Sequence, residues 1–216
     1  GGLATLMWSF AKGGHQPGAD TLEKAAGALV AAGAAGLRST DAARLLWAYA
    51  RFGKPPSPPL RHVLLAAVRA QLPACSGQEL VNVLWAAASL RLHLPADFAD
   101  IADELAAPGR ADLTPQGAAL ALWAHAVMGL PAPGLCAAVT AFAAPRLGEF
   151  EPKNLAILVW ALGALGALRA PLLTAAARQL DASPGRWAAK DLRSMYQADM
   201  LLRAAESEEG GGAPRG

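Results

Sequence analysis

The residues of this chain that could carry out chemistry are few and lie far apart. Its only cysteines, Cys75 and Cys136, form no C-x-x-C motif, which favours a reducing compartment and argues against a disulfide framework. No nucleophile has a base at a catalytic spacing. The glycine run that begins at Gly210 lacks the Lys-Ser/Thr pair of a phosphate loop. We therefore expect no catalysis in this segment.

The histidines do not form a site either. They fall in different segments, and none has the spacing to a Cys, Asp or Glu cluster that a metal centre needs. We expect ordinary surface or turn histidines at His15, His62, His93 and His125. The sequence thus predicts neither a bound metal nor a cofactor.

Tryptophan provides a regular spacing instead. Five of these residues are separated by 39, 38, 38 and 37 residues: Trp8, Trp47, Trp85, Trp123 and Trp160. A period of this size is typical of helical repeat proteins. Tyr196, 36 residues after Trp160, marks a degenerate sixth copy, whereas Trp187 falls outside the register. We predict an all-α fold, an α-solenoid of about five to six helix-turn-helix repeats with a period near 38 residues.

Positions counted from each Trp predict which neighbouring helix each face of the first helix contacts. Apolar residues at −5, −2, +2 and +5 form one stripe, which should face the second helix of the same repeat. Small residues at −4 and +3 let the adjacent repeat approach the indole, so we interpret the five Trp residues as structural repeat anchors on another side of the helix. At +6 stands a glycine that ends the helix in four repeats: Gly14, Gly53, Gly129 and Gly166.

The expected array covers residues 1–205. Its repeats are placed at about 1–38, 39–75, 76–113, 114–150 and 151–186, with a degenerate cap at 187–205 and second helices near 21–32, 59–71, 96–105, 134–142 and 171–180. The Gly-rich, acidic tail 206–216 is expected to be disordered. The longest apolar stretch, 155–168, is shorter than the roughly 20 residues of a membrane span, so we expect a buried helix and no membrane partner.

Charge gives little guidance, but its placement is regular. The chain of 216 residues is 54% hydrophobic and 17% charged, with a formal net charge of +2, which does not by itself indicate a nucleic-acid partner. Variable polar residues recur at positions −7, −6, −3 and +4 and predict an exposed ridge along the first helices. In the fourth and fifth repeats this ridge is apolar, and a protein could bind there.

Short sequence phrases recur at the starts and centres of the first helices: Asn82-Val83-Leu84-Trp85, Pro152-Lys153-Asn154-Leu155, Thr114-Pro115-Gln116 and Ser76-Gly77-Gln78-Glu79-Leu80. These phrases resemble the octotricopeptide repeats of green-algal organelle proteins and the related repeats that precede the RAP domain in FAST-kinase-like proteins. The stretch 191–197 resembles the end of such arrays, just before a RAP domain. The resemblance covers roughly residues 3–202, and no RAP domain follows in this sequence.

This resemblance implies binding of single-stranded organellar RNA and a role in RNA processing, stability or translation. It implies a chloroplast location, with the mitochondrion as the alternative. The side chains at the ridge positions are of types that contact phosphates or base edges. The resulting candidates are Lys12, Thr40, Arg44, Arg51, Gln78, Asn82, Gln116, Lys153 and Asn154.

Two other interpretations remain open. A protein-binding scaffold of the HEAT or armadillo kind obeys the same repeat physics, and the polar ridge could be only a solvated face. The Trp residues could stack bases, but the small residues that flank them favour packing. Salt-dependent binding of single-stranded RNA would distinguish the first two.

Overall fold

The computed structural model describes residues 2–108 and 112–211. Within these residues the chain is helical and contains no strand, so the predicted all-α class is confirmed. The helices are α1 (Gly2–Lys12), α2 (Ala19–Ala32), α3 (Ser39–Arg51), α4 (Pro58–Arg69), α5 (Gly77–Ser89), α6 (Pro95–Ala106), α7 (Pro115–Met128), α8 (Pro133–Ala143), α9 (Pro152–Ala164), α10 (Ala170–Ala182) and α11 (Ala189–Gly211). Three short 3₁₀ helices lie at Leu72–Ala74, Ala144–Glu149 and Pro184–Arg186.

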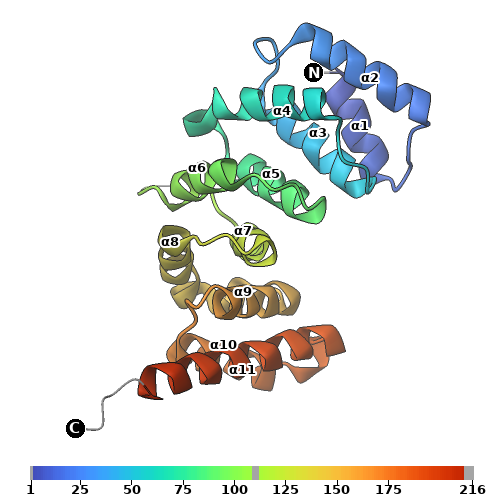
Figure 1. The fold of residues 1–216 in the computed structure, drawn as a ribbon. Coiled ribbons are helices and arrows are strands. Elements are labelled where there is room, and N and C mark those ends of the chain that lie inside the picture. Colours follow the sequence, from blue (N-terminus) through green and yellow to red (C-terminus); the bar gives the residue numbers. More distant parts are fainter. Residues whose placement is uncertain (1, 109–111, 212–216) are drawn as a thin grey trace. The chain divides into compact units, whose positions relative to one another are not determined.

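The chain divides into two compact units, Gly1–Asp112 and Leu113–Gly216. In the first unit α1 packs on α3, and α3 packs on α5 (Figure 1). In the second unit α7 packs on α9, and α9 packs on α11. Each unit is therefore built on a row of Trp- or Tyr-bearing first helices. The division falls within a residue of the repeat boundary expected at 113/114.

The first helices begin and end close to the positions that the sequence predicts. Thr114 is the N-cap of α7, and its Oγ1 accepts a hydrogen bond from the Gly117 N–H at 3.0 Å. Ser76 and Glu79 form a capping box, in which each side chain accepts a hydrogen bond from the other residue's backbone N–H. The +6 glycines are left-handed, with φ of +72° at Gly14 and +65° at Gly129. These local bonds explain why the helix bounds follow the sequence pattern closely.

Arg91 is the exception at position +6. It stands where four other repeats have glycine, and it is the one non-glycine residue with positive φ, at +52°, among the residues described. The turn that joins α5 to α6 therefore has a positive φ at the same position as its counterparts. The L side chain makes that shape less favourable.

The core stripe faces the second helix in four repeats but not in the first. At position −2, the buried residues are Leu45, Val83, Ala121 and Leu158, and their helices contact α4, α6, α8 and α10 respectively. Leu6 occupies the same position in α1 and is 48% exposed. The expectation is wrong there because α2, which follows a glycine-rich turn, packs mainly on α4.

Helix α11 extends farther than predicted. The expected disordered tail began at residue 206, whereas α11 continues to Gly211, and residues 212–216 lie outside the described part. The strong helix formers Ala204, Ala205 and Glu206 continue the pattern of α11 without a stop signal.

Candidate nucleic-acid interface

The tryptophans of the first unit form a row. The ring centroids of Trp8 and Trp47 are 6.4 Å apart, and those of Trp47 and Trp85 are 6.2 Å apart. Both pairs are tilted, by 41° and 36°. All three indoles are only half-buried. Consecutive first helices thus touch through their indoles, as the repeat spacing predicts for this unit, and the row also borders solvent.

Two cations of the ridge lie over these rings. Lys12 Nζ is 4.8 Å from the centroid of Trp8, and Arg51 Cζ is 5.8 Å from that of Trp47. Both cations stand at position +4, one helical turn after their Trp. The sequence predicts that the Trp residues and the polar ridge lie on different sides of the first helix, and this prediction is wrong. Indoles and cations form one surface, because position +4 lies only about 40° around the helix from the Trp.

The other candidates of this unit also border solvent. Gln78 is exposed, while Thr40, Arg44 and Asn82 are half-exposed. The Gln78 side-chain amide donates a hydrogen bond to Asn82 Oδ1 at 3.0 Å along α5. Because α1, α3 and α5 lie side by side, equivalent register positions on them face the same way. We call this surface of Trp8, Trp47, Trp85 and the neighbouring ridge side chains the Trp–cation ridge.

Helix α6 is the acidic second helix of this unit. Helix α6 carries Asp97, Asp100, Asp103 and Glu104 and no Lys or Arg. Asp97 is buried and receives two hydrogen bonds from Arg69, at 2.6 and 2.7 Å. The first helices instead carry Lys12, Arg44 and Arg51 on the ridge. The second-helix side is thus acidic at α6, and the ridge presents cations, which is the arrangement that attracts a polyanion.

Acidic residues of the first turn serve the helix ends. In α11, Asp191 Oδ2 at position −5 from Tyr196 accepts a hydrogen bond from the Ala188 N–H at 3.1 Å. In α5, Glu79 Oε2 at position −6 accepts one from the Ser76 N–H at 2.7 Å. In α3 the same position is Asp41, which is buried and pairs with Arg38 at 3.1 Å. Burial raises the pKa of Asp41, but hydrogen bonding to Arg38 helps to lower it overall. Asn154 shares this register, which favours a structural role for it over RNA contact.

The second unit presents a different ridge. Gln116 and Lys153 are exposed at position −7, but positions −3 and +4 hold Leu120, Ile157, Val127 and Ala164. On α11 the equivalent positions carry an exposed Arg193 at −3 and Tyr196, which is 65% exposed, in the Trp register. The spacing from Trp160 identifies Tyr196 as the mark of a degenerate sixth copy, but Arg193 was not predicted because this segment was interpreted only as a cap. The register of Tyr196 was the signal that could have identified Arg193.

His125 is buried, with no exposed surface, so its assignment as a surface or turn histidine is wrong. It stands at position +2 of α7, on the stripe that faces the second helix, where Tyr49 and Leu162 are also buried. Burial lowers its pKa, although a backbone hydrogen bond opposes this shift. The other histidines, His15, His62 and His93, are exposed as expected.

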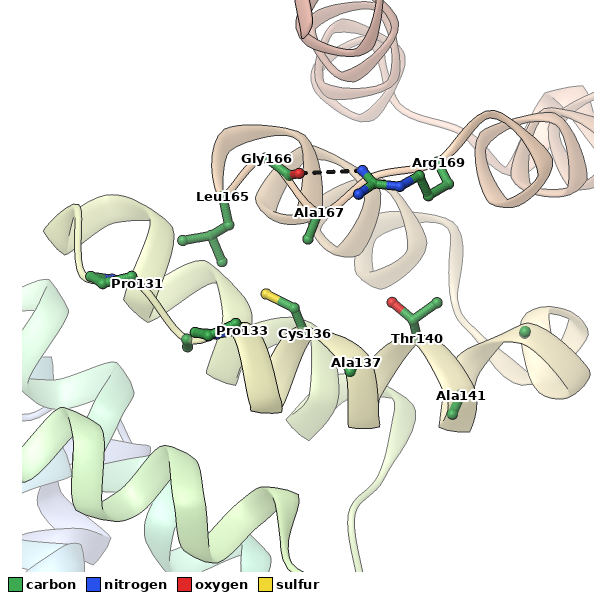
Figure 2. Close-up of a pocket in the computed structure, with 12 residues that line it drawn as sticks. Pro131, Pro133, Cys136, Ala137, Thr140, Ala141, Leu165, Gly166, Ala167 and Arg169 are labelled. Atoms are coloured by element: carbon green, nitrogen blue, oxygen red, sulfur yellow. Dashed lines mark hydrogen bonds between the residues drawn. The ribbon is translucent and has the colours of Figure 1, made fainter. Parts of the chain in front are cut away.

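A groove of about 690 Å³ lies on the second-helix side of the second unit, between α8 and the turn after α9. Figure 2 shows Cys136 and Thr140 projecting from α8 toward the turn that carries Leu165 and Ala167. The Arg169 guanidinium donates to the carbonyls of Gly166 and Leu168, at 3.3 and 2.9 Å. Burial raises the pKa of the Cys136 thiol, which disfavours the reactive thiolate. The groove is thus lined mainly by small apolar groups.

Two further findings concern the described residues. No group of three or more His, Cys, Asp or Glu side chains in 2–108 and 112–208 is arranged to hold a metal ion. None of the helices described combines the length and the hydropathy that a membrane crossing needs.

The chain matches no known family model. It also matches no curated protein.

Proposed function

We propose that this chain is an RNA-binding helical-repeat segment that acts in organellar RNA processing, stability or translation, without catalysis of its own. The observation that carries the proposal is the Trp–cation ridge, where Lys12 and Arg51 lie over a row of half-exposed indoles. Cations that neutralise phosphates and aromatic faces that accept bases are the two parts of a single-strand binding surface. The family resemblance supports the same proposal, with a chloroplast location first and a mitochondrial one second.

The proposed architecture is a solenoid of five to six repeats with a period near 38 residues. First helices begin at residues 2, 39, 77, 115, 152 and 189, which agrees with that period. One helix of each pair then brings the same register positions to the ridge. A strand of RNA could thus meet a similar set of contacts in each repeat.

The roles proposed for the side chains follow from their chemistry. Lys12, Arg44 and Arg51 would neutralise phosphates and release counterions, which makes affinity dependent on salt. The amides of Gln78 and Asn82 offer a donor and an acceptor to base edges. In the second unit Gln116, Lys153 and Arg193 would extend these contacts.

Fluorescence anisotropy with a labelled single-stranded RNA 20-mer tests the proposal. We expect the purified chain to bind, with an affinity that falls from 50 to 200 mM salt. Replacing Lys12, Arg44 and Arg51 together by Ala should reduce the slope of log K against log salt by about 2, at about 0.7 per phosphate contact.

The matched control removes the same charge from other surfaces of the same unit. Lys24→Ala, Lys54→Ala and Arg61→Ala change α2, the turn after α3, and α4. This triple variant should bind like the unchanged chain. Equal slopes for the two triple variants, or no binding by the unchanged chain at 50 mM salt, would rule the ridge out as an RNA surface.

A protein-binding scaffold of the HEAT or armadillo kind is the second candidate. It is favoured by the apolar ridge of the second unit and by exposed side chains on α11, where Leu192 is 41% and Met200 50% exposed. Absence of RNA binding at low salt would favour it.

A further inference from the structure

A hollow of about 460 Å³ opens in the second unit between α9 and α11. Its walls are Trp160, Ala164, Gln197, Met200 and Leu201. The first two residues come from α9 and the other three from α11. Its volume lies within the range of about 300–1,000 Å³ that is typical of small-ligand sites.

Small residues on α9 create this hollow. A Cβ at Gly163 would lie 3.3 Å from Leu201 Cδ1 and 3.6 Å from Ala198 Cα, so the glycine lets α11 approach closely. One residue later, Ala164 stands at position +4. In α1 and α3 this position holds the cation that lies over the ring of its own Trp. A methyl group cannot reach over the ring in this way, and the space beside Trp160 is left open.

The lining suits a planar, partly polar ligand. The indole of Trp160 offers an aromatic wall, Met200 and Leu201 are apolar, and Gln197 contributes a side-chain amide. Arg193 is exposed one turn before Gln197 on α11. An aliphatic protein side chain in the hollow would make no hydrogen bond to the exposed amide of Gln197. A nucleobase would supply a ring face for the indole and a donor–acceptor edge for the amide, and its phosphate would find Arg193 nearby.

We propose that this hollow binds one unstacked nucleobase of single-stranded RNA, with Trp160 as the stacking wall and Gln197 as the edge-reading side chain. The proposal rests on the RNA-binding function proposed above and adds a site in the unit that has fewer ridge cations. The contact is mainly stacking and hydrogen bonding. Its loss should therefore weaken binding without changing the salt dependence, unlike the loss of a phosphate contact.

Ala164→Phe tests the proposal by filling the hollow from an exposed position. We expect it to weaken binding of a single-stranded 4-thiouridine RNA 12-mer roughly tenfold, the scale of one stacked base, at an unchanged salt slope. Photocrosslinks from this RNA to the peptides of α9 and α11 should also be lost. Ala182→Phe adds the same side chain at an exposed position of α10 and is the control, expected to bind like the unchanged chain.

Gln197→Leu provides a second test that fills no space. It should weaken binding roughly threefold to tenfold while circular dichroism stays unchanged, because a base edge loses its partner. If the unchanged chain binds RNA and both variants bind equally well, the hollow is not a base site, although the ridge function stands. An apolar protein side chain would then be the better occupant. If the unchanged chain does not bind RNA, the function itself fails.

Discussion

At the scale of single residues, burial and charge decide what each side chain can do. His125, at position +2 of α7, has no exposed surface. Its imidazole therefore belongs to the core of the second unit and not to a surface site. Lys12 and Arg51, by contrast, each lie over a half-exposed indole, so their alkyl stems and charges are both used at the surface.

His125 should make the stability of the protein depend on pH. Burial lowers its pKa below the ordinary value of 6.5, so the folded chain binds fewer protons than the unfolded chain at mildly acidic pH. Its favourable contribution is complete above pH 6.5 and is lost as pH falls through the window below that value. Urea unfolding between pH 8 and 5 should show a smaller loss of stability for His125→Leu than for the unchanged chain. Equal losses would contradict this assignment.

At the scale of the elements, helix ends and turns fix the repeat. Capping by Ser76 and Thr114 starts α5 and α7 where the sequence predicts. Left-handed glycines end most of the first helices, and the chain then returns along a second helix. Position −6, which looked available for RNA contact, holds the N-terminus of α5 through Glu79, and Asp191 at position −5 does the same in α11. Capping thus limits which ridge residues remain for binding.

Arg91→Gly should stabilise the turn between α5 and α6. Arg91 is exposed and has φ of +52°, a backbone region that costs an L residue about 1 kcal/mol and glycine very little. We expect the free energy of unfolding, measured in urea, to rise by up to about 1 kcal/mol. Arg91→Ala retains the Cβ and serves as the control. A gain for the alanine variant as large as for the glycine variant would show that the charge, and not the backbone, matters.

At the scale of the whole molecule, contacts concentrate within the two compact units. The centre of the first unit is α3, and that of the second is α9, since each of these helices packs on first helices at both sides. In repeat architectures stability is the sum of such neighbour terms, so different parts can unfold at different free energies. We therefore expect a destabilising substitution in one unit to increase local unfolding mainly in that unit.

Leu45→Ala and Leu158→Ala form a matched pair for this expectation. Both leucines stand at position −2, and they are 1% and 0% exposed. Each substitution should cost about 2–5 kcal/mol through lost burial and an added cavity. Hydrogen exchange followed by mass spectrometry should show faster exchange mainly in 2–108 for Leu45→Ala and in 113–211 for Leu158→Ala. Equal acceleration of both ranges by both variants would indicate one cooperative unit.

The sequence by itself determined the helices, the ends of most of them and the registers of the five Trp residues. These features depend on neighbours within a few positions, namely caps such as Thr114, left-handed glycines such as Gly53, and the 3.6-residue period. It also identified the polar side chains of the ridge, since most of them stand at repeated positions. The position of Tyr196 was visible, but its consequence for Arg193 was not recognised.

Only the tertiary structure decided how these parts meet. It placed cations over Trp8 and Trp47, buried His125, left Leu6 exposed and opened the hollow beside Trp160. Each of these outcomes depends on which helix packs against which and how closely, and that is set by side-chain volumes on two or more elements at once. A register position fixes the direction of a side chain on its own helix, whereas the neighbour that covers it comes from a distant part of the chain.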